Sequence, residues 1–546
     1  MPVTNLRADL AADSELGAGN VLLKLGEHGA DPDGPGITFD VPVDGYPAWT
    51  TFTLGGLTTR VAARAAWLTG HGVRPRDPVA VYATSAADVL LNYAALTWLG
   101  AIPALMNPNM PGDVAVPFIQ QLRASAVLAD EEHLRLLEGR DLCGAALLPE
   151  VSRTGTGDPA EAPAHYRHHA DDLVAITHSS GTTRMPTAVV HSHASLFAAV
   201  REIWLTEPRP RLRARELSVL PAAHTSGIIT FNQSLCNRYE QAVLSNQGGP
   251  FPRSGEAVLD AIERWKPTGV YGFAVTWAEL ARFDLTRRDL GSVVNWFNTG
   301  DSAHETHIRK LIAVGSHLEY TRVGVVAVRG SKFVDGIGSS EMGHAVFRIA
   351  HRVGSDRYGR CVGKPYPFAE VALLDLDTGR PVPDGAVGHL ALKSPTLAPG
   401  YWNGSVAAFR TRFGGYYLTG DLMYRDEEGY YYHVDRAVDA VDLGGGDWLY
   451  TALAEEHVLV RCPDVRDCTV VAGSRDGRVV TDVLLILEPG ADPDADRGAA
   501  VREALGGPAA ATLRHITIVD EDDIVLGPTG KVRKFLMRQR HLAAAA

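Results

Sequence analysis

The chain contains the stretch Thr177-His-Ser-Ser-Gly-Thr-Thr-Arg-Met-Pro-Thr-Ala-Val-Val-His191. Its core, 177–183, is mostly Ser, Thr and Gly, and it lies between two apolar runs that are typical of strands, 173–176 and 188–190. Small hydroxyl side chains and accessible backbone N–H groups in such a loop suit a polyphosphate. No Lys-Ser/Thr pair follows at the spacing of a P-loop. A solvated Ser/Thr-rich loop is the alternative interpretation of this stretch taken alone.

Strand-like and helix-like segments alternate on both sides of this loop. The N-terminal side predicts helices over 57–72 and 86–99 and strands at 78–82, 102–106 and 124–129. The C-terminal side predicts strands at 216–220, 269–273 and 292–297, and a helix over 255–265 that ends before Pro267. Such alternation indicates parallel sheets with covered faces. We place a second block of this kind at 173–335, whereas residues 1–50 show little periodicity.

The pattern changes after Gly359. Alternating stretches at 369–375, 388–393 and 430–434 predict antiparallel strands that form a small barrel. A Gly-rich turn, 444–446, follows Arg436, and the remaining residues again mix helix and strand. The sequence therefore predicts an α/β fold in which residues 1–436 form a large N-terminal domain and residues 437–546 form a small α+β C-terminal domain.

The composition excludes several classes of protein. The formal net charge of −12 argues against binding nucleic acid or an anionic membrane by bulk electrostatics. The 45% hydrophobic and 21% charged content excludes general disorder. The five cysteines form no CxxC pair, and neither a leader sequence nor an apolar run of about 18 residues occurs. We expect a soluble cytoplasmic protein with a small-molecule substrate.

Three further motifs follow the Ser/Thr loop. Asp335-Gly-Ile-Gly-Ser-Ser-Glu341 combines glycines, which allow close approach of backbone to a ligand, with a carboxylate that suits Mg²⁺. Tyr417-Leu-Thr-Gly-Asp-Leu422, followed by Arg436, suits ribose hydroxyls and phosphate oxygens. Gly527-Pro-Thr-Gly-Lys-Val532 presents one Lys on a Gly-rich turn. Taken singly, each motif is also compatible with an ordinary loop.

In this order, the motifs resemble those of the adenylate-forming superfamily, which includes acyl- and aryl-CoA synthetases, peptide-synthetase adenylation domains and luciferases. The resemblance covers residues from about 50 to 540. It includes the weaker matches Leu220-Pro-Ala-Ala-His224, Thr299-Gly-Asp-Ser302, Val362-Gly-Lys-Pro365 and Pro399-Gly-Tyr-Trp402. It implies a two-step reaction: ATP and an oxyanion, usually a carboxylate, give an adenylate and pyrophosphate, and a nucleophile then displaces AMP. It also implies that the C-terminal domain rotates about a hinge between the two steps.

The resemblance implies a role for each matching residue. The phosphates would lie on Ser179, Ser180, Gly181, Thr182 and Thr183. Gly300, Asp301 and Ile337 would line the adenine, and Asp421 and Arg436 would bind the ribose or a phosphate. Glu341, beside Ser340, would bind Mg²⁺, and Lys531 would bridge the oxyanion and the α-phosphate. His224 would gate the acyl pocket, whose walls would include Phe273 and Gly338, with Trp277 and Met342 as further candidates.

The sequence also departs from the family pattern. Arg184-Met-Pro-Thr187 stands where Gly-x-Pro-Lys is usual, so the loop Lys is missing. Ile337 replaces the aromatic residue that commonly stacks on adenine, and Asp442 replaces a Lys used in the second step. The Asp or Lys that the family commonly has at its hinge would correspond to a position near Val438 or Asp439 of this chain. First-step adenylation is therefore expected to be intact, whereas thioester formation with CoA is in question.

Three functional interpretations follow. The first is a ligase that activates a small, aromatic carboxylate with ATP and Mg²⁺ and transfers it to CoA, a carrier-protein thiol or another nucleophile. The second is an ATP-dependent diazotase, which activates nitrite as a nitrosyl-adenylate-like species that an aromatic amine attacks. The third, a non-catalytic binding module, conflicts with the retention of Lys531 and Glu341. Tyr271, Phe273 and Trp296 at strand-like positions favour a flat aromatic substrate. For the oligomeric state, a monomer and a homodimer both remain open.

The histidines near the Ser/Thr loop could form a metal site, but their spacing favours packing roles. Only His191 and His193 have the i, i+2 spacing that places two side chains on one face of a strand, and no cysteine joins them. We therefore expect His178, His191 and His193 to have packing roles.

Overall fold

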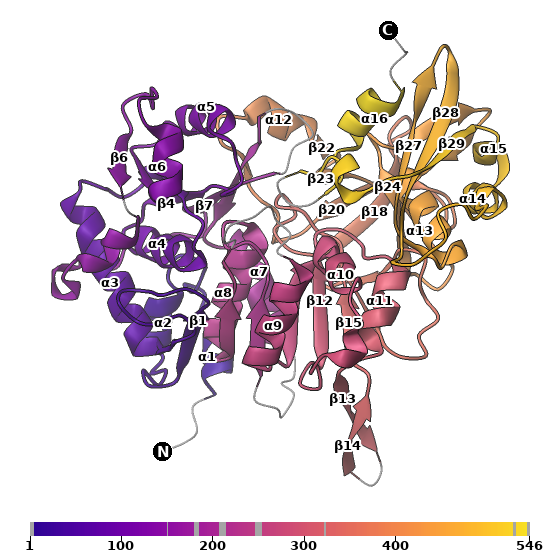
Figure 1. Ribbon diagram of the computed structural model, residues 1–546. Coiled ribbons are helices and arrows are strands. Elements are labelled where there is room, and N and C mark those ends of the chain that lie inside the picture. Colours follow the sequence, from indigo (N-terminus) through magenta and orange to yellow (C-terminus); the bar gives the residue numbers. More distant parts are fainter. Residues whose placement is uncertain are drawn as a thin grey trace.

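In the computed structural model, the residues described are 5–149, 151–179, 185–206, 214–245, 254–321, 324–527 and 531–542. Figure 1 shows the chain as two large sheets with helices against them and a C-terminal group of elements at one end. The described helices are α1 (Leu6–Ala12), α2 (Val21–Glu27), α3 (Leu54–Gly70), α4 (Ala86–Trp98), α5 (Gly112–Leu122), α6 (Glu131–Leu137), α7 (Ser195–Ala199), α8 (Thr225–Asn237), α9 (Gly255–Trp265), α10 (Ala274–Leu280), α11 (Glu305–Ile312), α12 (Ser405–Arg410), α13 (Thr451–Arg461), α14 (Gly498–Leu505), α15 (Gly507–Ala510) and α16 (Lys534–Leu542).

The first sheet has the strand order β21-β8-β7-β4-β3-β5-β6. Its strands are β3 (Pro78–Tyr82), β4 (Ile102–Leu105), β5 (Ala126–Ala129), β6 (Ala146–Pro149), β7 (Leu173–His178), β8 (Ala188–Ser192) and β21 (Gly400–Tyr401). Strands β3 to β7 are parallel, and β8 and β21 are antiparallel. The block boundary predicted at residue 173 is therefore wrong. Because β7 pairs with β4, the two strands around the Ser/Thr loop complete the first sheet rather than opening the second.

The second sheet begins with the order β2-β1-β10-β9-β11-β12-β15. Its strands are β1 (Pro35–Phe39), β2 (Thr51–Thr53), β9 (Arg215–Ser218), β10 (Glu240–Val243), β11 (Gly269–Phe273), β12 (Asn295–Thr299) and β15 (Lys332–Asp335). Strand β1 pairs in parallel with β10, so that Ile37 lies opposite Gln241. The N-terminal segment, whose sequence has little periodicity, therefore contributes α1, α2 and an edge of this sheet.

The row of strands continues through β16, where it becomes antiparallel, in the order β15-β16-β17-β24-β23-β20-β18-β19. These strands are β16 (Phe347–His351), β17 (Cys361–Pro365), β18 (Glu370–Asp375), β19 (Arg380–Pro381), β20 (Gly388–Lys393), β23 (Tyr416–Arg425) and β24 (Tyr431–Arg436), with β22 (Arg412–Phe413) beside β23. They include the stretches that the period-2 pattern predicts as antiparallel strands.

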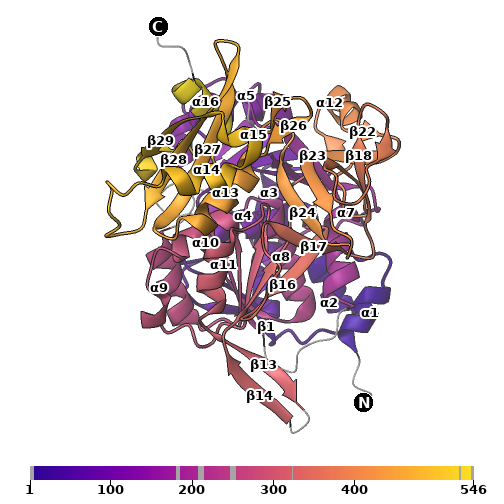
Figure 2. The same cartoon turned by 90° about the vertical axis from the view of Figure 1, so that its right-hand side faces the viewer.

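The elements after β24 belong to other sheets. The hairpin of β25 (Val441–Gly444) and β26 (Asp447–Leu449) leads to α13, and β27 (Val465–Arg475), β28 (Arg478–Leu487) and β29 (Leu513–Ile518) form a sheet with its own apolar cluster. The hairpin of β13 (Ser316–Thr321) and β14 (Gly324–Arg329) projects from the opposite end of the molecule (Figures 1 and 2). The last strand of this sheet in chain order, β24, ends at Arg436. The domain boundary at this residue stays a prediction.

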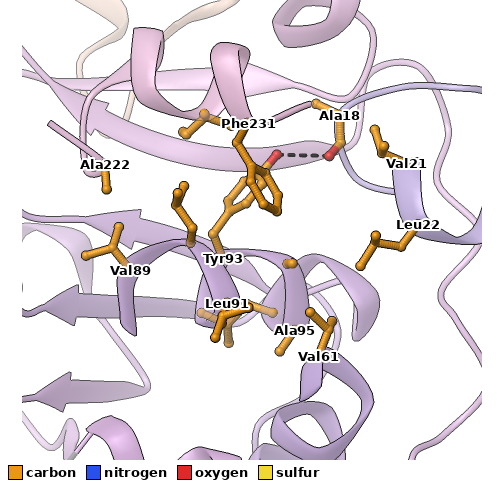
Figure 3. Close-up of a cluster of buried hydrophobic side chains, with 14 of the residues drawn as sticks. Ala18, Val21, Leu22, Val61, Val89, Leu91, Tyr93, Ala95, Ala222 and Phe231 are labelled. Carbon is orange, nitrogen blue, oxygen red and sulfur yellow. Dashed lines mark hydrogen bonds between the residues drawn. The ribbon is translucent and has the colours of Figure 1, made fainter. Parts of the chain in front are cut away.

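The largest apolar cluster lies around α4, with α3 and α8 packed beside it. Ser85 caps the N-terminus of α4, where its hydroxyl accepts the Asp88 N–H, and the helix is apolar around most of its circumference, as a largely buried helix must be. The phenol of Tyr93 in this helix donates a 2.9 Å hydrogen bond to the Ala18 carbonyl (Figure 3). The bond ties the N-terminal segment to the core. Within the described ranges, the helices are too short or too polar to cross a bilayer.

Three histidines beside this core, of which His193 is buried and His165 and His168 are half-buried, are expected to make stability depend on pH. The rings of His168 and His193 stack at 4.9 Å, and His165 lies next to His168. Burial lowers the pKa of His165 and His193 to about 4 and also lowers that of His168. The neutral form is therefore the one that packs in the folded state.

We expect the free energy of unfolding to fall as the pH drops from about 6.5 to 4. In that window the unfolded chain binds protons that the folded chain does not, at a cost of roughly 2–3 kcal/mol for each fully shifted histidine. His193→Gln should flatten this slope. Urea unfolding of the unmodified protein and of His193→Gln at several pH values between 4.5 and 7 measures the free energy of unfolding. If this free energy falls equally steeply with pH in both proteins, His193 is not a source of the pH dependence.

Candidate active site

A cavity of about 960 Å³ lies at the carboxyl ends of β11 and β12, between these strands and the C-terminal elements. The carboxyl ends of parallel strands are the usual location of ligands in α/β sheets. The walls include most of the candidate residues from the sequence: Ser179, His224, Phe273, Gly300, Asp301, Gly338, Ser340, Glu341, Arg436 and Lys531. Folding therefore brings the four separate motifs to one site.

The Ser/Thr loop meets the cavity at Ser179, whose backbone N–H donates to the Thr187 carbonyl. The predicted phosphate ligands Ser180, Gly181, Thr182 and Thr183 lie outside the described residues. Beneath the loop, the Thr177 hydroxyl lies 2.8 Å from His191 Nε2 and 3.0 Å from the Thr225 hydroxyl. This buried network, which the sequence analysis missed, ties the base of the loop to the start of α8.

His224 is the residue before α8 and faces the cavity. Its Nδ1 accepts the Ser226 N–H, so that its proton lies on Nε2, which is 3.5 Å from the Ser340 hydroxyl. Burial, together with the nearby His178 and Lys531, lowers the pKa of His224 to about 3. The side chain is therefore a neutral hydrogen-bond donor toward the cavity and not a cation.

His178 and His193 are held by the backbone. His178 Nε2 accepts the Asn107 N–H at 2.9 Å, and His193 Nδ1 accepts the Gly19 N–H at 3.1 Å. Among the described residues, no group of three or more His, Cys, Asp or Glu side chains has the arrangement of a metal site. These backbone contacts are those of packed side chains.

Asp301 marks the junction of the cavity with the C-terminal elements. Its carboxylate lies 3.2 Å from Arg360 Nη2 and 3.9 Å from Lys531 Nζ. Burial raises the pKa of Asp301, but the positive charges of Lys531 and Arg360 outweigh it and hold the pKa well below its usual range. The sequence analysis missed Arg360, because no motif marks it.

Asp421 lies on β23 directly opposite Arg436 on β24. Its carboxylate is 3.3 Å from Arg436 Nε and 3.5 Å from His433 Nε2. His433 Nδ1 accepts a 2.8 Å bond from Arg360, which leaves its proton on the Nε2 that faces Asp421. Burial raises the pKa of Asp421, but Arg436 and His433 outweigh burial and lower it to about 2. A fixed, ionised carboxylate therefore stands beside the cavity.

Glu341 contributes a carboxylate to the cavity wall near Ser340. Tyr401 lies within 3.5 Å of its Oε1, and the Ala398 N–H binds its backbone carbonyl. Mg²⁺ in nucleotide sites is held by one or two carboxylates together with phosphates and waters. A single carboxylate on this wall fits that coordination.

Lys531 reaches the cavity from a loop that is closed by the Gly527 N–H, which donates to the Lys531 carbonyl at 2.7 Å. Its side chain is 46% exposed, so it is free to bind a ligand. Three ion pairs join the C-terminal elements to the large sheets: His304–Glu456, Lys310–Glu488 and Arg282–Glu521. They hold the arrangement in which Lys531 faces Asp301.

Of the predicted residues that the structure describes, Trp277, Met342, Ile337 and Asp421 do not line the cavity. Trp277 is fully buried, donates from Nε1 to Asn298 and packs edge-on against Trp296. Met342 and Ile337 are buried in the antiparallel part of the structure. The structure therefore gives Trp277 and Met342 a packing role in place of a substrate wall, and Gly336 and Gly338 form the wall on either side of Ile337.

Among the described positions where the sequence departs from the family pattern, Asp442 does not line the cavity, whereas Val438 and Asp439 do. Asp442 is exposed in the β25–β26 hairpin, where its carboxylate accepts the Gly444 N–H. Val438 and Asp439 line the rim, and Asp439 forms an ion pair with Arg538. A hinge at this position would have to release that pair.

Comparison with known proteins agrees with the geometry. Residues 33–402 match the AMP-binding enzyme family. The chain is 42% identical over 571 aligned residues to 3-aminoavenalumate diazotase from Streptomyces sp., with 98% of each chain covered. It is 26% identical over 512 residues to 3-hydroxybenzoate–CoA ligase from Aromatoleum sp. (strain CIB), covering 89% of this chain and 91% of that one. A solved anthranilate CoA ligase in complex with anthranoyl-AMP has the same fold, with a TM-score of 0.82, 21% identity and 98% of each chain covered. The predicted α/β fold is confirmed.

Proposed function

We propose that this chain, which belongs to the AMP-binding enzyme family and is an adenylate-forming enzyme, acts as an ATP-dependent diazotase on an aromatic amine. The observation that carries the proposal is the 42% identity to a diazotase over 98% of both chains. The ligase is similar at 26% over a smaller part of the chain. The exposed Asp442, in place of a second-step Lys, supports the same choice.

In the first step, a nitrite oxygen attacks the α-phosphorus of ATP and pyrophosphate leaves. Negative charge spreads over the five-coordinate phosphorus, and Lys531, whose Nζ lies 3.9 Å from Asp301 at the cavity wall, is placed to stabilise it. Neutral His224 adds a hydrogen-bond donor without a second positive charge. The product is a mixed anhydride of nitrous acid and AMP.

In the second step, the amine nitrogen of the substrate attacks the nitroso nitrogen and AMP leaves with one nitrite oxygen. The N-nitroso intermediate then loses the other nitrite oxygen as water, together with the two amine hydrogens, and yields the diazonium or diazo product. The apolar walls around Phe273 limit access of water, which would otherwise hydrolyse the anhydride.

Four further residues at or beside the cavity would bind the nucleotide. Asp421 suits bidentate hydrogen bonding to the ribose hydroxyls, Arg436 suits a phosphate or the ribose, and Gly300 and Asp301 would line the adenine. Glu341 would hold Mg²⁺, which when bound neutralises phosphate charge. We further propose that residues 437–546 rotate as a mobile domain between the steps.

An isotope experiment tests this function directly. With ¹⁸O-labelled nitrite, ATP, Mg²⁺ and an aromatic amine, we expect AMP that contains one labelled oxygen. We expect no AMP when nitrite is omitted and no continued turnover to AMP when the amine is omitted. Mass spectrometry of AMP measures the label. AMP that forms from aryl acids and CoA, with label only from an ¹⁸O-labelled carboxylate, would instead establish the aryl-acid ligase with CoA or a carrier thiol as acceptor.

A further inference from the structure

The substrate side of the cavity is a deep aromatic slot. The rings of Tyr271 and Phe297 stack at 4.5 Å and 11°, and Trp204 stands edge-on to both. Its entrance is formed by His224 and Phe273, whose rings lie 5.1 Å apart in a T-shape. These five side chains all line the cavity, so a flat ring enters between aromatic faces.

The slot continues well beyond the length of one ring. Gln233 lines its far end and is seven residues along α8 from Ser226, which lines the entrance. At 1.5 Å per helical residue, the two positions are roughly 10 Å apart along the helix. The slot therefore fits an elongated substrate.

The far end of the slot is polar, and Glu216 on β9 is at its centre. Its Oε2 accepts the Ser234 hydroxyl at 2.7 Å, and its Oε1 accepts the Tyr271 phenol at 2.9 Å and the Gln233 amide at 3.3 Å. The residue is 4% exposed and lines the cavity. Because a carboxylate offers about four acceptor positions, three donors leave room for one more.

A purely structural role explains this arrangement poorly. A buried carboxylate costs far more free energy than a neutral side chain of the same size, and no Lys or Arg among the described residues pairs with Glu216. Burial accordingly raises the pKa of Glu216 to about 7. Burying the Glu216 carboxyl at the end of the slot costs free energy that the protein's own contacts do not offset. We infer that a ligand donates the missing hydrogen bond to this carboxyl.

We propose that Glu216 is a specificity-determining residue that selects an elongated aromatic amine whose far end carries a protic group, a hydroxyl or a carboxylic acid. The hydroxyl would donate its proton to Oε2, whereas a carboxylic acid would share one proton with Glu216. The identity of the amine end rests on the proposed function. The recognition of the protic end does not, because it is a binding property of the slot.

Binding of rigid probes tests the proposal without nitrite. Isothermal titration in the presence of AMP would compare 3-aminobiphenyls that carry hydroxyl, methyl or carboxyl at the 4′ position. We expect the hydroxyl probe, the carboxyl probe or both to bind about 10- to 30-fold more tightly than the methyl probe. Affinity that falls as the pH rises above 7 would identify the carboxylic acid, which shares one proton with Glu216, and affinity that rises with pH through 7 would identify the hydroxyl, which donates to the ionised carboxylate.

Glu216→Gln should reduce the protic-over-methyl preference to about threefold or less and abolish the pH dependence. Ser234→Ala is the matched control, because Ser234 binds Glu216 but does not line the cavity. It should lower the melting temperature while the preference remains. Equal binding of all three probes by the unmodified protein, or an unchanged preference in Glu216→Gln, would overturn the proposal. A failed isotope experiment with the probe preference intact would refute the diazotase and leave the role of Glu216 standing.

Discussion

Lys531→Ala is expected to lower the rate of AMP formation by about 100-fold or more. The Lys531 ammonium lines the cavity and lies 3.9 Å from the Asp301 carboxylate. The attack on the α-phosphorus gathers negative charge that is absent in the ground state, and loss of one transition-state contact of this kind commonly costs 10²–10³-fold in rate. The KM for ATP should change much less than kcat.

The measurement is pyrophosphate release at saturating ATP, nitrite and amine. Lys266→Ala provides a control, because Lys266 forms an exposed ion pair with Asp289 and does not line the cavity. The control should retain full activity. An unchanged rate in Lys531→Ala would show that the motif at 527–532 has no catalytic role in this chain.

Asp421→Asn is expected to lower kcat/KM for ATP by about 100-fold. The Asp421 carboxylate is buried and is held in its ionised form by Arg436 and His433. Asparagine keeps the shape but removes the charge, so that Arg436 loses its partner and the ribose loses a bidentate acceptor. Hydrogen bonds to a charged group contribute about 1.5–3 kcal/mol each, so weakening the two bonds to the ribose is expected to cost about 3 kcal/mol. A loss of 3 kcal/mol corresponds to about 100-fold.

Asp426→Asn is a matched control on the same β23–β24 hairpin. The Asp426 carboxylate lies 3.3 Å from Arg357 and does not line the cavity. Its loss should leave kcat/KM for ATP within about twofold. Titration with AMP separates binding from catalysis: if Asp421→Asn binds AMP as tightly as the unmodified protein, the ribose assignment is wrong.

Local patterns predict the elements well where one period dominates. The predicted strand at 78–82 and helix at 255–265 match β3 and α9 residue for residue, and the start of the 86–99 helix matches that of α4. Each of these elements is specified by an apolar run or by a 3.6-residue period within its own short segment. Contacts with distant parts of the chain are therefore not needed to predict it.

Sheet membership could not be predicted in the same way. Leu173 opens β7, which pairs with β4 and β8 and not with the strands of the second sheet, and Ile37 pairs with Gln241 about 200 residues away. Strand pairing depends on backbone hydrogen bonds between segments that can lie anywhere along the chain. The apolar pattern of a strand is the same whichever neighbour it takes.

In the candidate site, too, some residues can be predicted from local sequence and others only from the tertiary structure. Lys531, Glu341, Asp421 and Arg436 could be found from their motifs, because catalysis requires given side chains next to glycines that shape a turn. Trp277 has the chemistry of a pocket wall, yet the tertiary structure packs it into the core.

By itself, the sequence determined the elements, the order of the motifs and the chemistry at each motif, because short-range geometry and side-chain type suffice for these. Only the tertiary structure decided which buried polar groups line the cavity. Arg360, His433 and Glu216 stand in no motif, and they acquire their roles from partners on other strands. The physical reason is that burial and the electrostatic environment of a side chain are properties of its three-dimensional surroundings, which the neighbouring sequence does not specify.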